Sequence, residues 1–198
     1  MVVFGITGGS GSGKTSVSKM LEKQGVHIID TDVIAHEIVE PNSECLNELV
    51  DYFGDSILND DKTLNRKKLA SIAFSDKQKT VALSNITHKY IKAEVVKDIN
   101  TTDAELVGID GAVIIGSNVE PLCEFIVSVI ADKQSRITRI KTRDNITDKQ
   151  AIQRINAQND DEFYKENSMY IIYNNGDIAQ LESDVVRLFN KIKGNSFE

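Results

Sequence analysis

The stretch that decides the fold reads Val2-Val3-Phe4-Gly5-Ile6-Thr7-Gly8-Gly9-Ser10-Gly11-Ser12-Gly13-Lys14-Thr15. Its first part, Val2–Ile6, is a short apolar run typical of a buried strand. Its second part, Gly8–Thr15, matches the pattern G-x-x-x-x-G-K-[ST] in full. The pattern then predicts a helix over Thr15–Gln24 and a second strand over Val26–Asp30. A strand, a glycine loop, a helix and a strand in this order predict a parallel sheet.

The glycine loop predicts a site for a nucleoside triphosphate. Glycines let the backbone curl so that successive N–H groups point at phosphate oxygens, and the helix adds the positive end of its dipole. Lys14 can reach the β- and γ-phosphates, and the Thr15 hydroxyl can ligate Mg²⁺. The alternative, a glycine turn that binds nothing, is disfavoured by the flanking strand and helix. The candidate nucleotide-binding residues are Gly9, Gly11, Ser12, Gly13, Lys14, Thr15 and Ser16.

Two carboxylates, Asp30 and Asp32, stand where the second strand ends. Because the carboxyl ends of adjacent parallel strands open onto the same crevice, we expect one of them to face the terminal phosphate. A carboxylate there can accept a hydroxyl proton or hold Mg²⁺ through water. The alternative is that Asp32 is only the N-cap of the next helix.

The rest of the chain alternates between helical and strand patterns. Further strands are expected at Glu105–Ile109, Phe125–Ala131 and Met169–Tyr173. Helices are expected at Asp76–Asn100, at Lys133–Lys141, from a capping box at Thr147–Gln150 to about Gln158, and at Asp177–Lys193 with Ile178, Leu181, Val185 and Leu188 on its apolar face. The sequence therefore predicts an α/β core, a helical insertion after the second strand and a basic helical hairpin after the fourth.

Size and composition indicate one globular domain. The chain has 198 residues, with 40% hydrophobic and 27% charged residues, which excludes a disordered chain, a collagen-like repeat and a coiled-coil rod. No apolar run approaches the ~20 residues that a bilayer needs. Cys45 and Cys123 match no zinc or redox spacing. With no secretory signal at the N-terminus, we expect a cytoplasmic protein that does not bind membranes.

Charge is distributed unevenly along the chain. The net charge of −7 argues against general nucleic-acid binding. The segment Lys133–Arg154 is nevertheless basic, with seven Lys or Arg against two Asp. Arg136, Arg139 and Arg143 share one helix face, and three guanidiniums there repel one another unless an anion lies against them. This favours a face that closes over phosphates as an arginine finger in cis, and the alternative is a solvated helix face.

Several short motifs together resemble the dephospho-CoA kinase family. Besides the loop Gly8–Thr15, they are Asp30-Thr31-Asp32-Val33-Ile34-Ala35, Thr63-Leu64-Asn65-Arg66, His88, Arg139, Arg143-Asp144, Arg154-Ile155-Asn156-Ala157-Gln158, Asn174-Asn175-Gly176 and Ser183-Asp184-Val185-Val186-Arg187-Leu188. The resemblance implies transfer of the γ-phosphoryl of ATP, with Mg²⁺, to the 3′-hydroxyl of dephospho-CoA, the last step of coenzyme A biosynthesis. It also implies a P-loop kinase-like parallel sheet flanked by helices. One domain would comprise a core (1–32, 101–132, 159–198), a helical substrate-binding region (33–100) and a lid (133–158).

The same resemblance implies roles for individual residues. Asp32 is similar to the family's general base, and Arg139 and Arg143 are similar to its lid arginines. Arg66 and His88 fall in the acceptor-binding region, where the alternatives are a surface salt bridge and an ordinary helix histidine. Asn175 and Gly176 fall near the adenine site. Asp110, which follows the third strand, is a further candidate for the acceptor side or for Mg²⁺, its alternative being a strand-end turn.

Three positions depart from the family pattern: Lys89 follows His88 where the family has proline, Ala112 replaces a proline and Gly116 replaces a glutamate. Two other functions therefore stay open. One is a P-loop kinase with another small acceptor, such as a nucleoside, a nucleotide or shikimate. The other is a nucleotide-binding regulatory module whose acceptor site has degenerated.

Overall fold

The computed structural model describes residues 1–195. The chain forms two compact units, each with its own packing. The first comprises Met1–Asp30 and the chain from Thr102 onward, and the second comprises Thr31–Thr101. The first unit contains the sheet, and the second is built mainly of helices.

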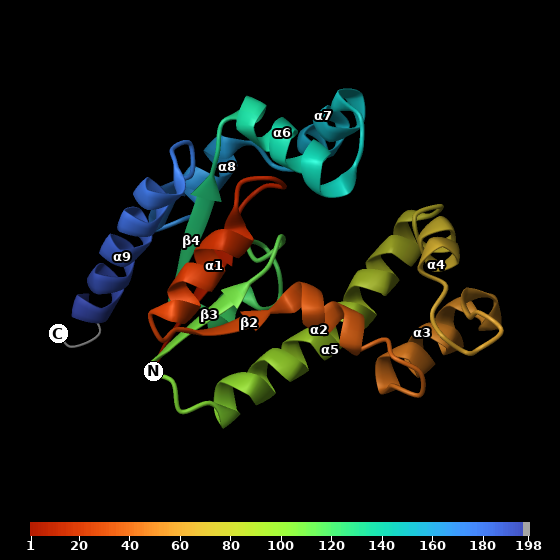
Figure 1. The fold of residues 1–198 in the computed structure, drawn as a ribbon. Coiled ribbons are helices and arrows are strands. Elements are labelled where there is room, and N and C mark those ends of the chain that lie inside the picture. The colour runs from red at the N-terminus through yellow and green to blue at the C-terminus, as the bar shows by residue number, and fades with distance from the viewer. Residues whose placement is uncertain (196–198) are drawn as a thin grey trace. The chain divides into compact units, whose positions relative to one another are not determined.

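The first unit is organised around a five-stranded parallel sheet. Its strands are β1 (Val2–Thr7), β2 (His27–Asp30), β3 (Leu106–Asp110), β4 (Phe125–Ile130) and β5 (Tyr170–Tyr173). Their order is β2-β3-β1-β4-β5, and every neighbouring pair is parallel. The predicted parallel sheet is confirmed, and the α/β arrangement of strands and covering helices is visible in Figure 1.

The strand order corrects one expectation. The second strand does not lie beside the first, because β3 occupies the place between them. Asp110, the last residue of β3, pairs in register with Ile6 on one side and with Asp30 on the other. The carboxylate at the end of the strand beside β1 is therefore that of Asp110. The residues of the first strand, helix and second strand carry no information about a strand that begins some 75 residues later. They could therefore not predict that β3 lies between β1 and β2.

The helices of the first unit are α1 (Lys14–Lys23), α6 (Lys133–Asp144), α7 (Asp148–Asn156), α8 (Asp161–Glu166), α9 (Ile178–Asn195) and the short η2 (Glu120–Leu122). Apolar side chains of α1 and α9 share a core with the sheet. Val17 and Leu21 of α1 and Val185 of α9 lie in the same cluster as Phe4 of β1. Burying such side chains is the main favourable term in folding. Ile178 was wrongly expected in this face: it starts α9 and is 61% exposed.

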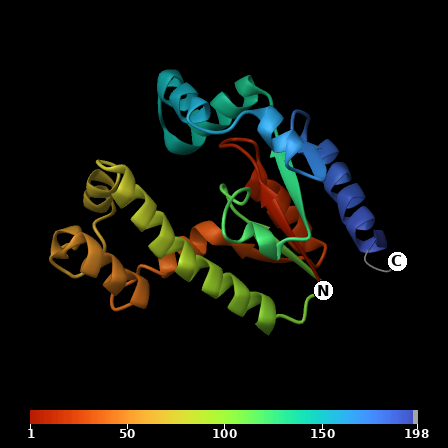
Figure 2. The ribbon, with the colours of Figure 1, turned by 180° about the vertical axis from the view of Figure 1, so that it is seen from behind.

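The helices α6 and α7 form the predicted basic hairpin. Asn145 ends α6 in the left-handed conformation with φ of 50°. Thr147 then caps α7 in a full capping box, in which its side chain accepts from the Gln150 N–H and the Gln150 side chain accepts in return from the Thr147 N–H. Ile137 and Ile140 of α6 pack against α7 in a small core of their own. Figure 2 shows the two helices side by side.

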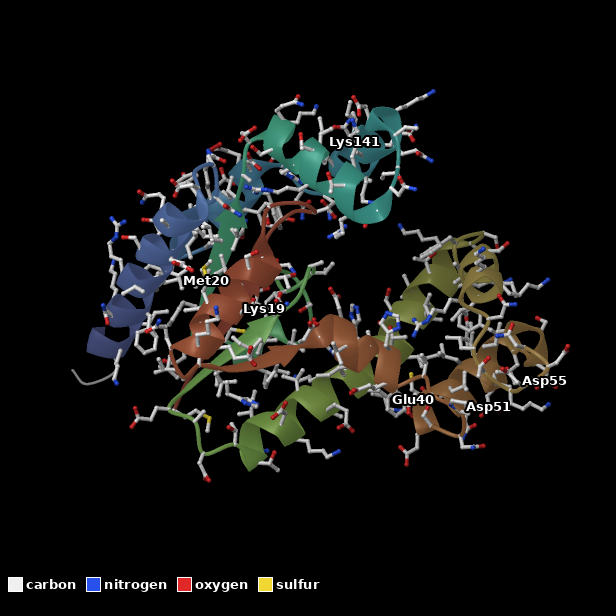
Figure 3. All side chains as sticks on the ribbon, viewed as in Figure 1. Lys19, Met20, Glu40, Asp51, Asp55 and Lys141 are labelled. Atoms are coloured by element: carbon white, nitrogen blue, oxygen red, sulfur yellow. The ribbon has the colours of Figure 1, made fainter. Side chains whose placement is uncertain are left out.

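The second unit packs shorter helices around one long helix. These are α2 (Thr31–Glu37), α3 (Glu44–Phe53), η1 (Asp55–Ile57), α4 (Arg66–Ala73) and the long α5 (Lys77–Thr101), which contacts α2, α3 and α4. In Figure 3 the labels Glu40, Asp51 and Asp55 mark the course of the chain from the end of α2 to η1. Across residues 1–195, every helix is too short or too polar to traverse a lipid bilayer.

Candidate active site

The loop between β1 and α1 adopts a conformation that only glycine allows at three positions. Gly8, Gly11 and Gly13 have φ angles of 149°, 78° and 98°. A Cβ atom on Gly8 would lie 2.3 Å from the Val129 carbonyl oxygen, and one on Gly13 would lie 2.0 Å from Asn174 Nδ2. A side chain at these positions is therefore disfavoured by backbone strain and by lack of room. The loop backbone packs directly against Val129 and Asn174.

The lysine of the loop is held by a carboxylate at the end of β3. Lys14 Nζ lies 2.9 Å from Asp110 Oδ1, and the two side chains are 15% and 7% exposed. The Ser18 hydroxyl, one turn further along α1, donates to Asp110 Oδ2 at 2.7 Å. Asp110 therefore lies at the loop, and the bare strand-end turn considered as its alternative does not describe this position.

Two arginines of α6 bind the backbone of the loop. Arg136 Nε donates to the Ser10 carbonyl at 2.9 Å, and Arg139 Nη1 donates to the carbonyls of Gly11 and Ser12 at 3.3 Å each. Arg143 makes a two-pronged contact with Asp144, at 2.7 and 2.9 Å. Each guanidinium of the face thus has oxygen partners within the protein. A bound anion is therefore not needed to balance their charges, and closure of this face over phosphates stays a prediction.

The Asp144 carboxylate joins the two helices of the hairpin, because Arg154 of α7 also donates to it. The guanidinium of Arg143 is the main cause that lowers the pKa of Asp144 to about 2. Asp144 consequently stays ionised throughout the neutral range and keeps Arg143 in place. The role of Arg143 toward a phosphate stays a prediction.

The turn after β5 contacts the same loop. Asn174 is buried, and its Nδ2 donates to the Ser12 carbonyl at 2.7 Å. Arg139 Nη2 donates to the Asn174 carbonyl at 3.0 Å. Asn175 Oδ1 accepts from the Asp132 N–H at 2.8 Å, so the predicted adenine-side residues Asn175 and Gly176 lie in a turn tied to the start of α6.

The loop also holds a polar group without a partner. Among residues 1–195, the Ser12 hydroxyl is buried and makes no hydrogen bond. An unpaired buried hydroxyl is unfavourable, and a phosphate oxygen is one group that can satisfy it. Thr15 and Ser16 are exposed in the first turn of α1, at the positive end of the helix dipole. These features fit a bound polyphosphate.

The remaining predicted residues belong to the second unit. Asp32 is exposed in the first turn of α2. Arg66 is the first residue of α4, which the Asn65 side chain caps by accepting from the Lys68 N–H at 2.9 Å. His88 is half-buried in the middle of α5. Next to it, Lys89 pairs with Glu48 of α3 at 2.7 Å.

The structure adds residues that the sequence argument missed. Ser18 follows Lys14 by one helical turn, so the spacing alone could have placed it beside the lysine. Gln158 and Arg136 both reach Ser10 in the loop. Asn174 stands next to Asn175 in the predicted turn. The contacts of Gln158 and Asn174 span 148 and 162 residues, and no local pattern signals them.

Comparison with known proteins agrees with this geometry. A family model described as dephospho-CoA kinase matches residues 2–180. Proteins named dephospho-CoA kinase from Lactobacillus johnsonii and Listeria monocytogenes are 35% and 34% identical, covering 96% and 97% of this chain and 97% and 98% of their own.

Solved structures agree as well. A dephospho-CoA kinase from Campylobacter jejuni superposes with a TM-score of 0.69 at 25% identity, covering 98% of both chains. A shikimate kinase from Acinetobacter baumannii, with a TM-score of 0.57 at 18% identity over 100% of this chain and 96% of its own, shares the fold. The expected P-loop kinase-like fold is confirmed, and the chain belongs to the dephospho-CoA kinase family.

Proposed function

We propose that this protein is an ATP-dependent kinase that transfers the γ-phosphoryl group to the 3′-hydroxyl of dephospho-CoA. The observation that carries the proposal is the loop Gly8–Thr15, with Lys14 and Asp110 paired at its base, in a chain of this family. A cytoplasmic location, as expected from the sequence, belongs to the same proposal.

The chemistry proceeds mainly by positioning and charge neutralisation. The acceptor oxygen forms a bond to the γ-phosphorus, the bond from that phosphorus to the bridging oxygen breaks, and ADP leaves. The loop N–H groups and Lys14 stabilise the charge on the phosphoryl oxygens. Asp32 takes the hydroxyl proton as general base, and Arg139 and Arg143 add positive charge near the transferred group. Arg66 and His88 bind the acceptor, and Asn175 and Gly176 contact the adenine.

Magnesium fits the side chains at the loop. Within the described residues there is no cluster of three or more His, Cys, Asp or Glu that could hold a metal by itself. Magnesium bound with a nucleotide needs few protein ligands, because phosphates and waters fill most of its coordination sphere. Thr15 and Asp110 are the residues proposed to hold it. When bound, it neutralises charge on the β- and γ-phosphates.

A coupled assay of ADP production tests the function. ATP and Mg²⁺ are supplied with dephospho-CoA, with shikimate, with adenosine, with AMP or with no acceptor. The proposal expects ADP production that depends on dephospho-CoA, together with a product phosphorylated at the 3′ position. Turnover with another acceptor supports a different small-molecule kinase. Tight ATP binding without turnover of any acceptor supports the regulatory module, for which Ala112 and Gly116 are the favouring features.

A further inference from the structure

We propose that Arg136, together with Gln158, is a positioning residue that sets the backbone of the phosphate loop in its binding conformation. The inference rests on the proposed function only in taking ATP as the ligand of the loop. Arg136 acts on the loop from outside and touches no part of the substrate.

A phosphate-binding loop has two sides with different hydrogen-bonding needs. When the peptide N–H groups turn toward a phosphate, the carbonyl oxygens of the same peptides turn away from it. Carbonyls that point away and are shielded from water need donors of their own. In this chain three successive carbonyls have them: Arg136 donates to that of Ser10, Arg139 to those of Gly11 and Ser12, and Asn174 to that of Ser12.

Arg136 is built into this contact. It is only 5% exposed, although arginine is usually a surface residue. Its backbone carbonyl and Cα approach Gly11 so closely that a Cβ there would lie 2.8 Å from the carbonyl oxygen. Its guanidinium covers Gly9, where a Cβ would lie 2.3 Å from Nη2.

The guanidinium of Arg136 is committed to the protein by all three of its nitrogens. Nε binds the Ser10 carbonyl, Nη2 donates to Gln158 Oε1 at 3.3 Å, and Nη1 lies 3.6 Å from Asp161 Oδ1. These contacts hold the guanidinium in place, and through the Ser10 carbonyl they hold the backbone of the loop. A bidentate or forked contact of this kind is one that lysine cannot reproduce.

Gln158 provides the second anchor on the same residue of the loop. Its Oε1 accepts from the Ser10 N–H at 2.8 Å, and its Nε2 donates to the Ser10 hydroxyl at 3.2 Å. Ser10 is thereby held at its N–H, its carbonyl and its side chain. Arg136 lies near the start of α6, and Gln158 follows α7. Both ends of the hairpin α6–α7 therefore bind Ser10 of the loop.

The test measures nucleotide affinity of the full-length protein in the absence of acceptor. The variants are Arg136→Met, which keeps the aliphatic stem, Gln158→Leu, and the double variant. The control is Arg187→Met, an exposed arginine of α9 that likewise pairs with an aspartate. The dissociation constants of ATP and of AMP are measured by titration calorimetry, with the thermal midpoint recorded for each variant.

Loss of a hydrogen bond to a charged group predicts a rise of about 10-fold or more in the ATP dissociation constant for Arg136→Met. The AMP constant should change less than about twofold, because AMP lacks the β- and γ-phosphates that the loop and Lys14 are expected to bind. The double variant should show less than the product of the single effects, since both residues hold Ser10. Arg187→Met should leave both constants unchanged.

Equal losses for ATP and AMP, or unchanged ATP affinity in a folded Arg136→Met variant, would overturn the inference. If Arg136→Met does not fold, Gln158→Leu decides by the same comparison of ATP with AMP. The kinase assay of the unmodified protein is independent of this result. A protein that binds ATP as described yet transfers nothing to dephospho-CoA contradicts the proposed function and leaves the positioning role intact.

Discussion

Lys14 Nζ and Asp110 Oδ1 lie 2.9 Å apart, joining the start of α1 to the end of β3 across 96 residues of sequence. Both side chains are mostly buried, so the pair is only weakly screened by solvent. The lysine expected to bind phosphates is therefore tied to the end of β3 by this pair. Ser18 fixes the other oxygen of the same carboxylate.

Replacing Lys14 by alanine should reduce turnover by about 10³-fold or more, because the ammonium stabilises the charge on the transferred phosphoryl group. The same change leaves the Asp110 carboxylate buried without its cation, which costs about 3 kcal/mol of stability. ADP production and urea unfolding measure the two effects. Lys19→Ala, an exposed lysine of the same helix labelled in Figure 3, is the control and should retain activity. Normal turnover of Lys14→Ala would remove Lys14 from the mechanism.

Replacing Gly13 by alanine should abolish ATP binding. The residue has φ of 98°, which strains any side chain, and the new Cβ would lie 2.0 Å from Asn174 Nδ2, so the Asn174 amide that donates to the Ser12 carbonyl must shift or the loop must move. Gly25→Ala is a matched control, since Gly25 has φ of 96° but nothing lies within 4 Å of its added Cβ. It should lose about 1 kcal/mol of stability and keep its ATP affinity. Equal ATP affinities for the two variants would contradict the tight packing of the loop.

Replacing Asp32 by asparagine should keep ATP binding and lower kcat by about 10²- to 10⁴-fold, because the amide cannot accept the acceptor's proton. Glu37→Gln, an exposed acid at the other end of α2, is the control. Single-turnover kinetics separates the chemical step from product release. Asp32 is the second residue of α2 and not its N-cap, so if the Asp32 variant turns over at the normal rate, another group takes the proton.

The two thiols should react slowly with alkylating reagents. Burial raises the pKa of Cys45 to about 11 and that of Cys123 to about 12, so both are protonated near pH 8. Relative to the ordinary thiol value of 9.0, the thiolate fraction at pH 8 falls roughly 100-fold or more. Alkylation by iodoacetamide at pH 8 should therefore be at least that much slower in the folded protein than in guanidinium chloride.

The same thiols predict a direction for stability at high pH. A folded-state pKa above the unfolded one means that the contribution is fully present below pH 9 and is lost as the pH rises toward 11 to 12. Urea unfolding between pH 8 and 11 measures this loss, and the Cys45→Ala, Cys123→Ala double variant should show less of it. If the free energy of unfolding fell equally with pH in the unmodified protein and in the double variant, the loss would not come from the two thiols.

Much of the site's chemistry is local in sequence and was therefore predictable. The apolar run Val2–Ile6, the glycines and the following helix specify the loop between them, since strand period, positive φ and helix start are properties of adjacent residues. The capping box at Thr147 likewise predicted where α7 begins. In the second unit the helix expected at Asp76–Asn100 matches α5 (Lys77–Thr101). Short helices such as α2 and η1 were given no bounds, because they depend on their packing more than on their own periodicity.

The sequence alone determined that a polyphosphate loop opens a parallel sheet and that a basic hairpin follows the fourth strand. Only the tertiary structure decided that β3 separates β1 from β2, that Asp110 holds Lys14, and that Arg136 binds the Ser10 carbonyl within the protein. The reason is physical: the first group of features arises from dihedral preferences and periodicity within a few residues. The second arises from pairing between segments about 100 residues apart, whose geometry is fixed by the packing of the whole unit.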